Sequence, residues 1–367
     1  MANVLIHADT VRSAELRHEI PLSIPDAFTY IEQNGSRLVF APSLEAPRLA
    51  EVGLFDIVPL EHLGIDELLA SGRSRAEISR ELVLRACRHA GVEQAVVPGD
   101  FPLEAADYLR ANGVALTADP ETFDERRRAK NHAELEGIRR AQAGTEAALD
   151  AIRARLREGE DVTCEDLQGI ALRTFAERGL AAPESLIVSH GEQTAVGHEI
   201  GHGRIAAGEP IVCDLFPQDT KSGCFTDMTR TFCLGAPPGE LVRIHALCRE
   251  ALERVYEAVR PGVSGAELHR ISCEPFEREG IKTQLSKDPG EVLDEGYHHS
   301  LGHGVGLEVH EEPGLGRAGQ ELVEGDVVAI EPGAYRKGFG GCRLEDLVLV
   351  TVDGCEPFTR YPYDLAP

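Results

Sequence analysis

Short apolar runs alternate with helical patterns over residues 1–125. Within residues 65–90 the apolar side chains recur near a 3.6-residue spacing, which predicts a helix. Residues 95–98 predict a short buried strand, and residues 103–111 predict a further helix that ends at Asn112-Gly113. This alternation favours an α/β domain. The segment has no glycine-rich phosphate loop and no nucleophile motif, so by itself it indicates no chemistry.

A repeated pattern organises residues 126–367. After a long predicted helix over residues 133–156, two helical segments show the same order of signals: a turn with glycine, an N-cap hydroxyl residue and a closing glycine. Hydroxyl side chains favour helix starts, and glycine favours the left-handed residue at a helix end. The paired N-caps and closing glycines are Thr163 with Gly179 and Ser264 with Gly280.

The strands of this region repeat as well. In each half an apolar strand ends in a carboxylate, and after a turn a Gly-Cys pair leads to a second carboxylate that opens another apolar strand. The two carboxylate pairs are Asp214 with Asp227 and Glu331 with Glu345. Because apolar strands flank them, we expect all four acids to point into the protein. Two such hairpins with the same Gly-Cys offset predict an internal duplication related by a pseudo-two-fold axis.

Composition restricts the class of protein. A formal net charge of -25 at pH 7 excludes nucleic acid as a partner, since phosphate contacts require clustered Lys and Arg. No segment approaches the roughly 20 apolar residues of a membrane span. The first twelve residues lack the apolar stretch of a secretory signal, and the nine cysteines include no Cys-x-x-Cys pair. We therefore expect a cytoplasmic protein with reduced, mostly buried thiols.

Four buried acids on facing hairpins require compensation. A buried, ionised carboxylate is destabilising by several kcal/mol unless a partner neutralises it. No lysine stands beside these acids, and Arg230 and Arg343 cannot balance four charges. Two divalent cations can, and carboxylates with an imidazole suit Mn²⁺, Co²⁺ or Zn²⁺. Because such a pair of ions lowers the pKa of water and polarises a carbonyl, the acids predict a hydrolase.

Residues 299–313, HSLGHGVGLEVHEEP, are rich in histidine and glycine. The glycines let the backbone approach a ligand closely, and His299, His303 and His310 would be unusual as filler. The segment resembles the signature of the pita-bread metallopeptidases, specifically the prolidase and aminopeptidase P branch. The resemblance extends from about Arg126 to the C-terminus and includes Arg128-x-Lys130.

This resemblance implies an α+β chain. A creatinase-like α/β domain would occupy residues 1–125, and a C-terminal pita-bread (creatinase/aminopeptidase) fold would occupy residues 126–367. The activity implied is metal-dependent cleavage of Xaa-Pro bonds in short peptides, by a dipeptidase or an aminopeptidase. The implied cofactors are two divalent ions per chain, Mn²⁺ foremost and Co²⁺ or Zn²⁺ as alternatives. A homodimer is also expected from the family.

The resemblance further implies a set of metal ligands. Asp227 and Glu345 would bridge the two metals. Asp214 would hold one ion, and Glu331 with His303 would hold the other.

Other residues receive catalytic or substrate roles from the same resemblance. Glu331 would carry a proton, and His310 would stabilise the tetrahedral intermediate by hydrogen bonding. His299 would line the pocket for proline, and Arg343 would lie near the substrate. His198 would meet the scissile carbonyl or the leaving nitrogen.

Several alternatives remain open at this level. Residues 198–202, HEIGH, match the zincin pattern, but Gly197, Gly201 and Gly203 disfavour the helix that a zincin requires. Within the fold, the alternatives are a methionine aminopeptidase-like enzyme, a creatinase-like protein without metal, and a non-catalytic binding protein. The N-terminal domain counts against the first, and the complete ligand set counts against the other two.

Overall fold

The computed structural model describes residues 2–159 and 161–367 and has two compact units. The first unit ends at Arg127 and the second begins at Arg128. The boundary expected between residues 125 and 126 falls inside helix α6 (Pro120–Arg128). Within the described ranges, no helix is long and apolar enough to cross a membrane.

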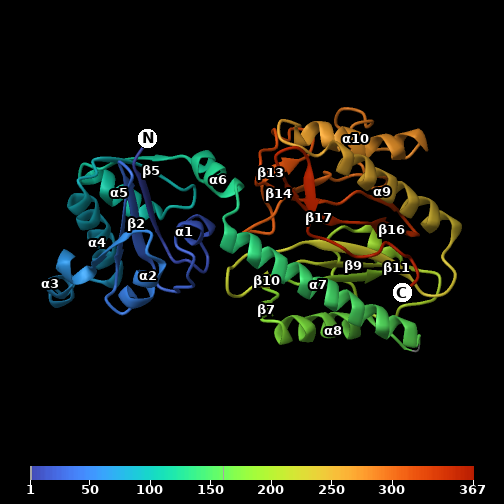
Figure 1. The fold of residues 1–367 in the computed structure, drawn as a ribbon, viewed down its shortest axis with the longest axis horizontal. Coiled ribbons are helices and arrows are strands. Elements are labelled where there is room, and N and C mark those ends of the chain that lie inside the picture. Colours follow the sequence, from blue (N-terminus) through green and yellow to red (C-terminus); the bar gives the residue numbers. More distant parts are fainter. Residues whose placement is uncertain (1, 160) are drawn as a thin grey trace. The chain divides into compact units, whose positions relative to one another are not determined.

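The first unit is built on one mixed sheet (Figure 1). Its strands are β1 (Val4–Ala8), β2 (Phe28–Gln33), β3 (Ser36–Ala41), β4 (Asp56–Pro59), β5 (Gln94–Val97) and β6 (Ala115–Ala118), in the order β4-β3-β2-β1-β5-β6. Its helices before α6 are α1 (Ala14–Glu19), α2 (Ala46–Val52), the 3-10 turn η1 (Leu60–Leu63), α3 (Ile65–Ala70), α4 (Arg75–Ala90) and α5 (Leu103–Ala111).

Successive side chains of β1 point to opposite faces of the sheet and pack into two separate hydrophobic cores. Leu5 packs with residues of α4 and α5, whereas Val4 and Ile6 pack with residues of α1 and α2. Helices therefore cover both faces of the sheet, as expected for an α/β domain. The strand and helix predicted at residues 95–98 and 103–111 are confirmed by β5 and α5.

The single helix predicted over residues 65–90 is wrong. The structure has two helices there, because Gly72 takes a left-handed backbone and Ser74 starts α4 with a capping box to Glu77. A strong N-cap signal inside an apolar periodic run ends one helix and begins the next.

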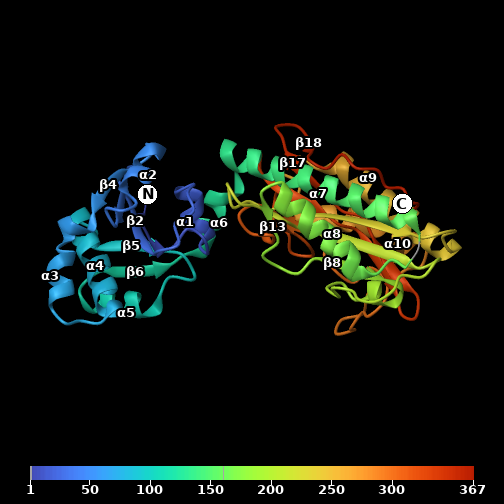
Figure 2. The same cartoon turned by 90° about the horizontal axis from the view of Figure 1, so that it is seen from below.

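In the part of the second unit that the structure describes, four α-helices pack with several small sheets (Figures 1 and 2). The helices are α7 (His132–Glu158), α8 (Cys164–Glu177), α9 (Gly239–Ala258) and α10 (Gly265–Arg278), and η2 (Gly191–Ala195) is a 3-10 turn. The strands of its first half are β7 (Leu180–Ala181), β8 (Ile187–His190), β9 (Pro210–Leu215), β10 (Gln218–Asp219) and β11 (Met228–Cys233). The strands of its second half are β12 (Gly302–Gly304), β13 (Glu311–Leu315), β14 (Val327–Ile330), β15 (Gly333–Arg336), β16 (Gly340–Arg343), β17 (Asp346–Val350) and β18 (Cys355–Pro357).

The two halves of this unit repeat one arrangement. In each, a pair of helices packs against an antiparallel sheet, with α7 and α8 on one side of the strands and α9 and α10 on the other (Figure 1). The predicted N-caps Thr163 and Ser264 are confirmed, and each also forms a β-bridge with a later loop. The closing glycines, Gly179 and Gly280, have the expected positive φ. All nine cysteines are free, and eight of them are buried.

Candidate metal centre

The predicted carboxylate hairpins form as antiparallel pairs. β9 pairs with β11 so that Leu215 lies opposite Met228, which brings the preceding residues, Asp214 and Asp227, to the same end of the hairpin. In the second half β14 pairs with β17, and Ile330 lies opposite Asp346. Glu331 follows β14 directly and Glu345 precedes β17, so the second pair of acids also shares one hairpin end.

Hydrogen bonds join the two halves at these ends. The Glu345 amide donates to the carbonyl of Thr229 at 3.1 Å. The Thr231 hydroxyl exchanges bonds with the backbone of Arg343, accepting at 3.1 Å and donating at 2.8 Å. Thr229 also donates from Oγ1 to Oε2 of Glu345 at 2.8 Å. The strands β11 and β16 are thereby held in a fixed register at the centre of the unit.

Three of the five expected ligands lie closest together. One ligand atom from each of Asp227, His303 and Glu345 lies within 4.8 Å of the other two. His303 Nε2 is 3.7 Å from Asp227 Oδ2 and also 3.7 Å from Oε1 of Glu331. Asp214 lies beside this group, where its Oδ2 accepts a 2.5 Å hydrogen bond from Arg343 Nη2.

Three of the acids are buried, Glu331 is partly buried, and the four repel one another. Burial raises the pKa of Asp227 well above its usual value, and the charges of Glu345, Asp214 and Glu331 add to the shift. Burial and the charge of Glu345 likewise raise the pKa of Glu331. Burial and the charge of Asp214 raise the pKa of Glu345 to about 8. The protein alone therefore disfavours the state in which all four acids are ionised.

The residues present fit a divalent metal centre. Asp214 Oδ1 and Asp227 Oδ1 are buried and have no hydrogen-bond partner among the described residues. Burial and the neighbouring His310 lower the pKa of His303 to about 4, so its imidazole is neutral. Its Nδ1 lies 3.1 Å from the Gly304 carbonyl, which directs the Nε2 lone pair toward the acids. Neutral imidazole with carboxylate oxygens is the donor set of such ions.

A cavity of about 710 Å³ opens onto these acids. All nine residues singled out from the sequence line it: Asp214, Asp227, His303, Glu331, Glu345, His198, His299, His310 and Arg343. The rings of His303 and His310 lie 4.1 Å apart between centroids. His198 stands on an exposed loop at the cavity wall.

Tyr335 links the histidine segment to Arg343 and was missed by the sequence analysis. Its hydroxyl lies 3.0 Å from His299 Nε2 and accepts from Arg343 Nη1 at 3.1 Å. His299 Nδ1 donates to the Ser300 carbonyl at 2.7 Å, which leaves Nε2 to accept from the tyrosine. Burial and the charge of Arg343 lower the pKa of His299 to about 3, so this ring is neutral too. Tyr335 stands in no motif, so its position in the sequence gave no signal.

Residues 198–202 do not form the helix that a zincin requires. His198 lines the cavity, whereas the His202 amide and carbonyl are bound by the side chain of Gln193. The structure thus confirms the expectation from the glycines that HEIGH is not a zincin site.

The sequence profile of metallopeptidase family M24 matches residues 136–352. The chain belongs to metallopeptidase family M24. Membership in a metallopeptidase family implies that this M24 peptidase uses a divalent metal, which agrees with the donor set described above.

Two relatives illustrate the similarity in sequence. The Xaa-Pro dipeptidase of Lactobacillus helveticus is 30% identical over 287 residues, which cover 74% of this M24 chain and 71% of that enzyme. The Xaa-Pro dipeptidase of Pyrococcus furiosus is 34% identical over 181 residues, or 49% of this chain and 48% of that enzyme. The M24 chain therefore spans about half the length of the Pyrococcus relative in this match.

Solved structures show the same fold. The X-Pro aminopeptidase of Thermotoga maritima aligns with a TM-score of 0.81 at 21% identity and covers 98% of this chain and 96% of its own. The prolidase of Pyrococcus furiosus aligns with a TM-score of 0.77 at 23% identity, over 99% of this chain and 97% of its own. These structures confirm the predicted pita-bread fold. The M24 match and the Lactobacillus relative confirm the resemblance to the prolidase and aminopeptidase P branch.

Proposed function

We propose that this M24 peptidase hydrolyses Xaa-Pro bonds in short peptides and holds two divalent ions, with Mn²⁺ preferred over Co²⁺ or Zn²⁺. The proposal rests on the convergence of four carboxylates and His303 on one cavity. Asp227 and Glu345 would bridge the ions, Asp214 would complete one ligand set, and Glu331 with His303 would complete the other. When bound, the ions would lower the pKa of a water molecule and polarise the scissile carbonyl.

Side chains of the protein would transfer the proton and stabilise the charge that develops on the scissile carbonyl. Glu331 would accept a proton from the attacking water and release it to the proline nitrogen, since general acid–base transfer requires a group within hydrogen-bond reach. His310, beside His303, would donate a hydrogen bond to the developing oxyanion. His198 at the cavity wall would contact the carbonyl or the leaving nitrogen.

Specificity for proline would arise on the side of the cavity that holds His299. Its ring is fixed by the Ser300 carbonyl and Tyr335, and Arg343 is fixed by Tyr335 and Asp214. A rigid wall of neutral aromatic groups suits a proline ring, whose nitrogen carries no hydrogen to be satisfied. Arg343 would then meet the part of the substrate that follows the scissile carbonyl.

The experiment compares Xaa-Pro dipeptides, Xaa-Pro-Yaa tripeptides and matched Xaa-Ala peptides with the protein reconstituted in Mn²⁺. We expect hydrolysis of at least one proline series and little of the alanine series. Dipeptide cleavage alone would identify a dipeptidase, and tripeptide cleavage an aminopeptidase. Equal cleavage of proline and alanine peptides, or none of any, would contradict the proposal. A homodimer and a location in the cytoplasm stay predictions from the family and the composition.

A further inference from the structure

One buried side chain of α7 contacts both chain neighbours of Asp227. Gln142 is 2% exposed. Its Oε1 accepts a 2.5 Å hydrogen bond from the hydroxyl of Thr226, and its Nε2 lies 3.1 Å from the sulfur of Met228. Asp227 itself is directed toward His303 and Glu345. Gln142 therefore restrains the side chains of the two residues that flank Asp227 in the sequence.

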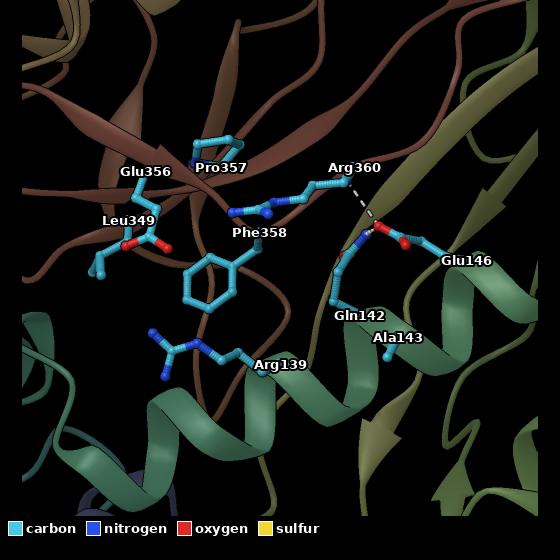
Figure 3. Close-up of a pocket in the computed structure, with 9 residues that line it drawn as sticks. All are labelled: Arg139, Gln142, Ala143, Glu146, Leu349, Glu356, Pro357, Phe358 and Arg360. Carbon is cyan, nitrogen blue, oxygen red and sulfur yellow. Dashed lines mark hydrogen bonds between the residues drawn. The ribbon is translucent and has the colours of Figure 1, made fainter.

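The orientation of the Gln142 amide is determined by its third neighbour. Nε2 donates to Oε1 of Glu146 at 3.2 Å, and the backbone amide of Arg360 donates to the same oxygen at 2.8 Å. A carboxylate only accepts hydrogen bonds, so the amide nitrogen of Gln142 must face Glu146 and its oxygen must face Thr226. Figure 3 shows Gln142 and Arg360 both directed toward the carboxylate of Glu146. The donor and the acceptor of each hydrogen bond are thereby fixed. The Gln142 amide cannot rotate without losing its hydrogen bonds to Thr226 and Glu146.

A small surface pocket ends at this glutamine. Its volume is about 210 Å³, and Gln142, Glu146 and Arg360 are among the residues that line it (Figure 3). Arg139 lies over the ring of Phe358 at the pocket's other end, 5.5 Å from the ring centroid. Gln142 thus contacts the buried neighbours of Asp227 and also lines this pocket.

We propose that Gln142 is a positioning residue for Asp227, an inference that rests on the proposed role of Asp227 as a metal ligand. Because Asp227 Oδ1 has no partner among the described residues, its direction is set by its backbone and by the residues beside it. Thr226 and Met228 are fully buried, and the hydrogen bond from Thr226 to Gln142 is a polar restraint that α7 places on this short segment. Groups that orient metal ligands from behind alter metal affinity about 10- to 100-fold when removed.

The test measures Mn²⁺ affinity by calorimetry on the full chain after its metal has been removed with a chelator. Gln142→Leu keeps the volume of the side chain and removes its hydrogen bonds, and Thr226→Val removes the matching hydroxyl. We expect each variant to weaken at least one Mn²⁺ binding step about tenfold or more. The double variant should weaken it no further than Gln142→Leu alone, because that change already breaks the bond that Thr226→Val removes. Thr226→Ser keeps the hydroxyl and should bind like the wild type.

Thr145→Ala is the matched control on the same helix. Thr145 is fully buried, and among the described residues its hydroxyl donates within α7, to the Ala141 carbonyl at 3.1 Å. We expect this variant to melt at a lower temperature and to keep Mn²⁺ affinity within about twofold of the wild type. If Gln142→Leu behaves like Thr145→Ala, Gln142 is structural only and the inference is overturned. If Gln142→Leu does not fold, the contrast between Thr226→Ser and Thr226→Val decides. A wild type that binds no Mn²⁺ would instead contradict the proposed function.

Discussion

Arg343 donates from Nη2 to Oδ2 of Asp214 across 2.5 Å at the edge of the four-carboxylate cluster. Both side chains are nearly buried, with exposed fractions of 6% and 12%. The same guanidinium donates from Nε to Thr229 and from Nη1 to Tyr335. Arg343 Nε also lies 3.9 Å from Oε2 of Glu331. Because this guanidinium carries a single positive charge, it compensates only part of the negative charge of the four acids.

Replacing Arg343 with Met should destabilise the metal-free protein more than the metal-loaded protein. Removing one partner of a buried ion pair costs about 3–5 kcal/mol, because the other charge remains uncompensated. Bound cations would neutralise Asp214 in the variant, so the loss should shrink when Mn²⁺ is present. Thermal denaturation with a chelator and with Mn²⁺ measures both losses. Arg270→Met is the control, since its exposed ion pairs contribute less than about 1 kcal/mol; equal losses for Arg343→Met in both conditions would contradict the account.

The metal-free protein should lose stability as the pH rises from 6.5 to 8.5, a range that spans the pKa of about 8 of Glu345. In the folded state the pKa values of Glu345, Asp227 and Glu331 are raised, so folding takes up protons. The stability that these protonated acids contribute is fully present below the ordinary carboxyl pKa. It is lost as the pH rises through the raised pKa of the folded state. The melting temperature of chelator-treated protein should fall across the range, and Glu345→Gln should flatten the fall. A melting temperature that rises with pH would contradict the raised pKa values.

Arg230 and Asp346 form a second buried ion pair, behind Glu345, at 2.7 Å. Arg230 also donates to the carbonyls of Glu345, Tyr361 and Pro362, so it joins the C-terminal segment to the centre. Arg230→Met should lower the unfolding free energy by about 3 kcal/mol or more, and adding Asp346→Asn should restore part of the loss. Chemical denaturation of the two single variants and the double variant gives the coupling. Strict additivity would show that the pair is not the source of the effect.

Glu199→Gln should leave kcat/KM for an Xaa-Pro substrate within about threefold of the wild type, because Glu199 does not line the cavity. In a zincin the corresponding glutamate is the general base, and the same change would abolish activity. Steady-state kinetics with Mn²⁺ separates these outcomes. Loss of activity at constant metal content would restore HEIGH as a functional motif.

Most of the fold of the second unit followed from the repeat in the sequence. The hairpin acids, the N-caps Thr163 and Ser264 and the closing glycines are local signals with a single physical meaning. The histidine segment added the missing imidazole, and the four hairpin acids and His303 line one cavity. A duplicated pattern is easier to interpret than a single one, because each half checks the other.

Other features depend on tertiary contacts that no local pattern encodes. Tyr335 and Gln142 stand in ordinary apolar or helical surroundings, and only folding brings them to Arg343 and Asp227. Apolar periodicity continues across the break between α3 and α4 and therefore predicts one helix, whereas α3 ends at Ala70 and the capping box at Ser74 starts α4. Periodicity indicates which face of a helix is buried, but it gives no information on which distant residue the helix will support.

Metal content measured together with hydrolysis tests the central claim most directly. The purified chain is loaded with Mn²⁺, freed of unbound metal and analysed by elemental mass spectrometry, alongside Asp227→Ala and Glu345→Ala. The account predicts two ions per wild-type chain with Xaa-Pro hydrolysis, and parallel loss of metal and turnover in both variants. Undiminished hydrolysis by protein that retains no metal would contradict it.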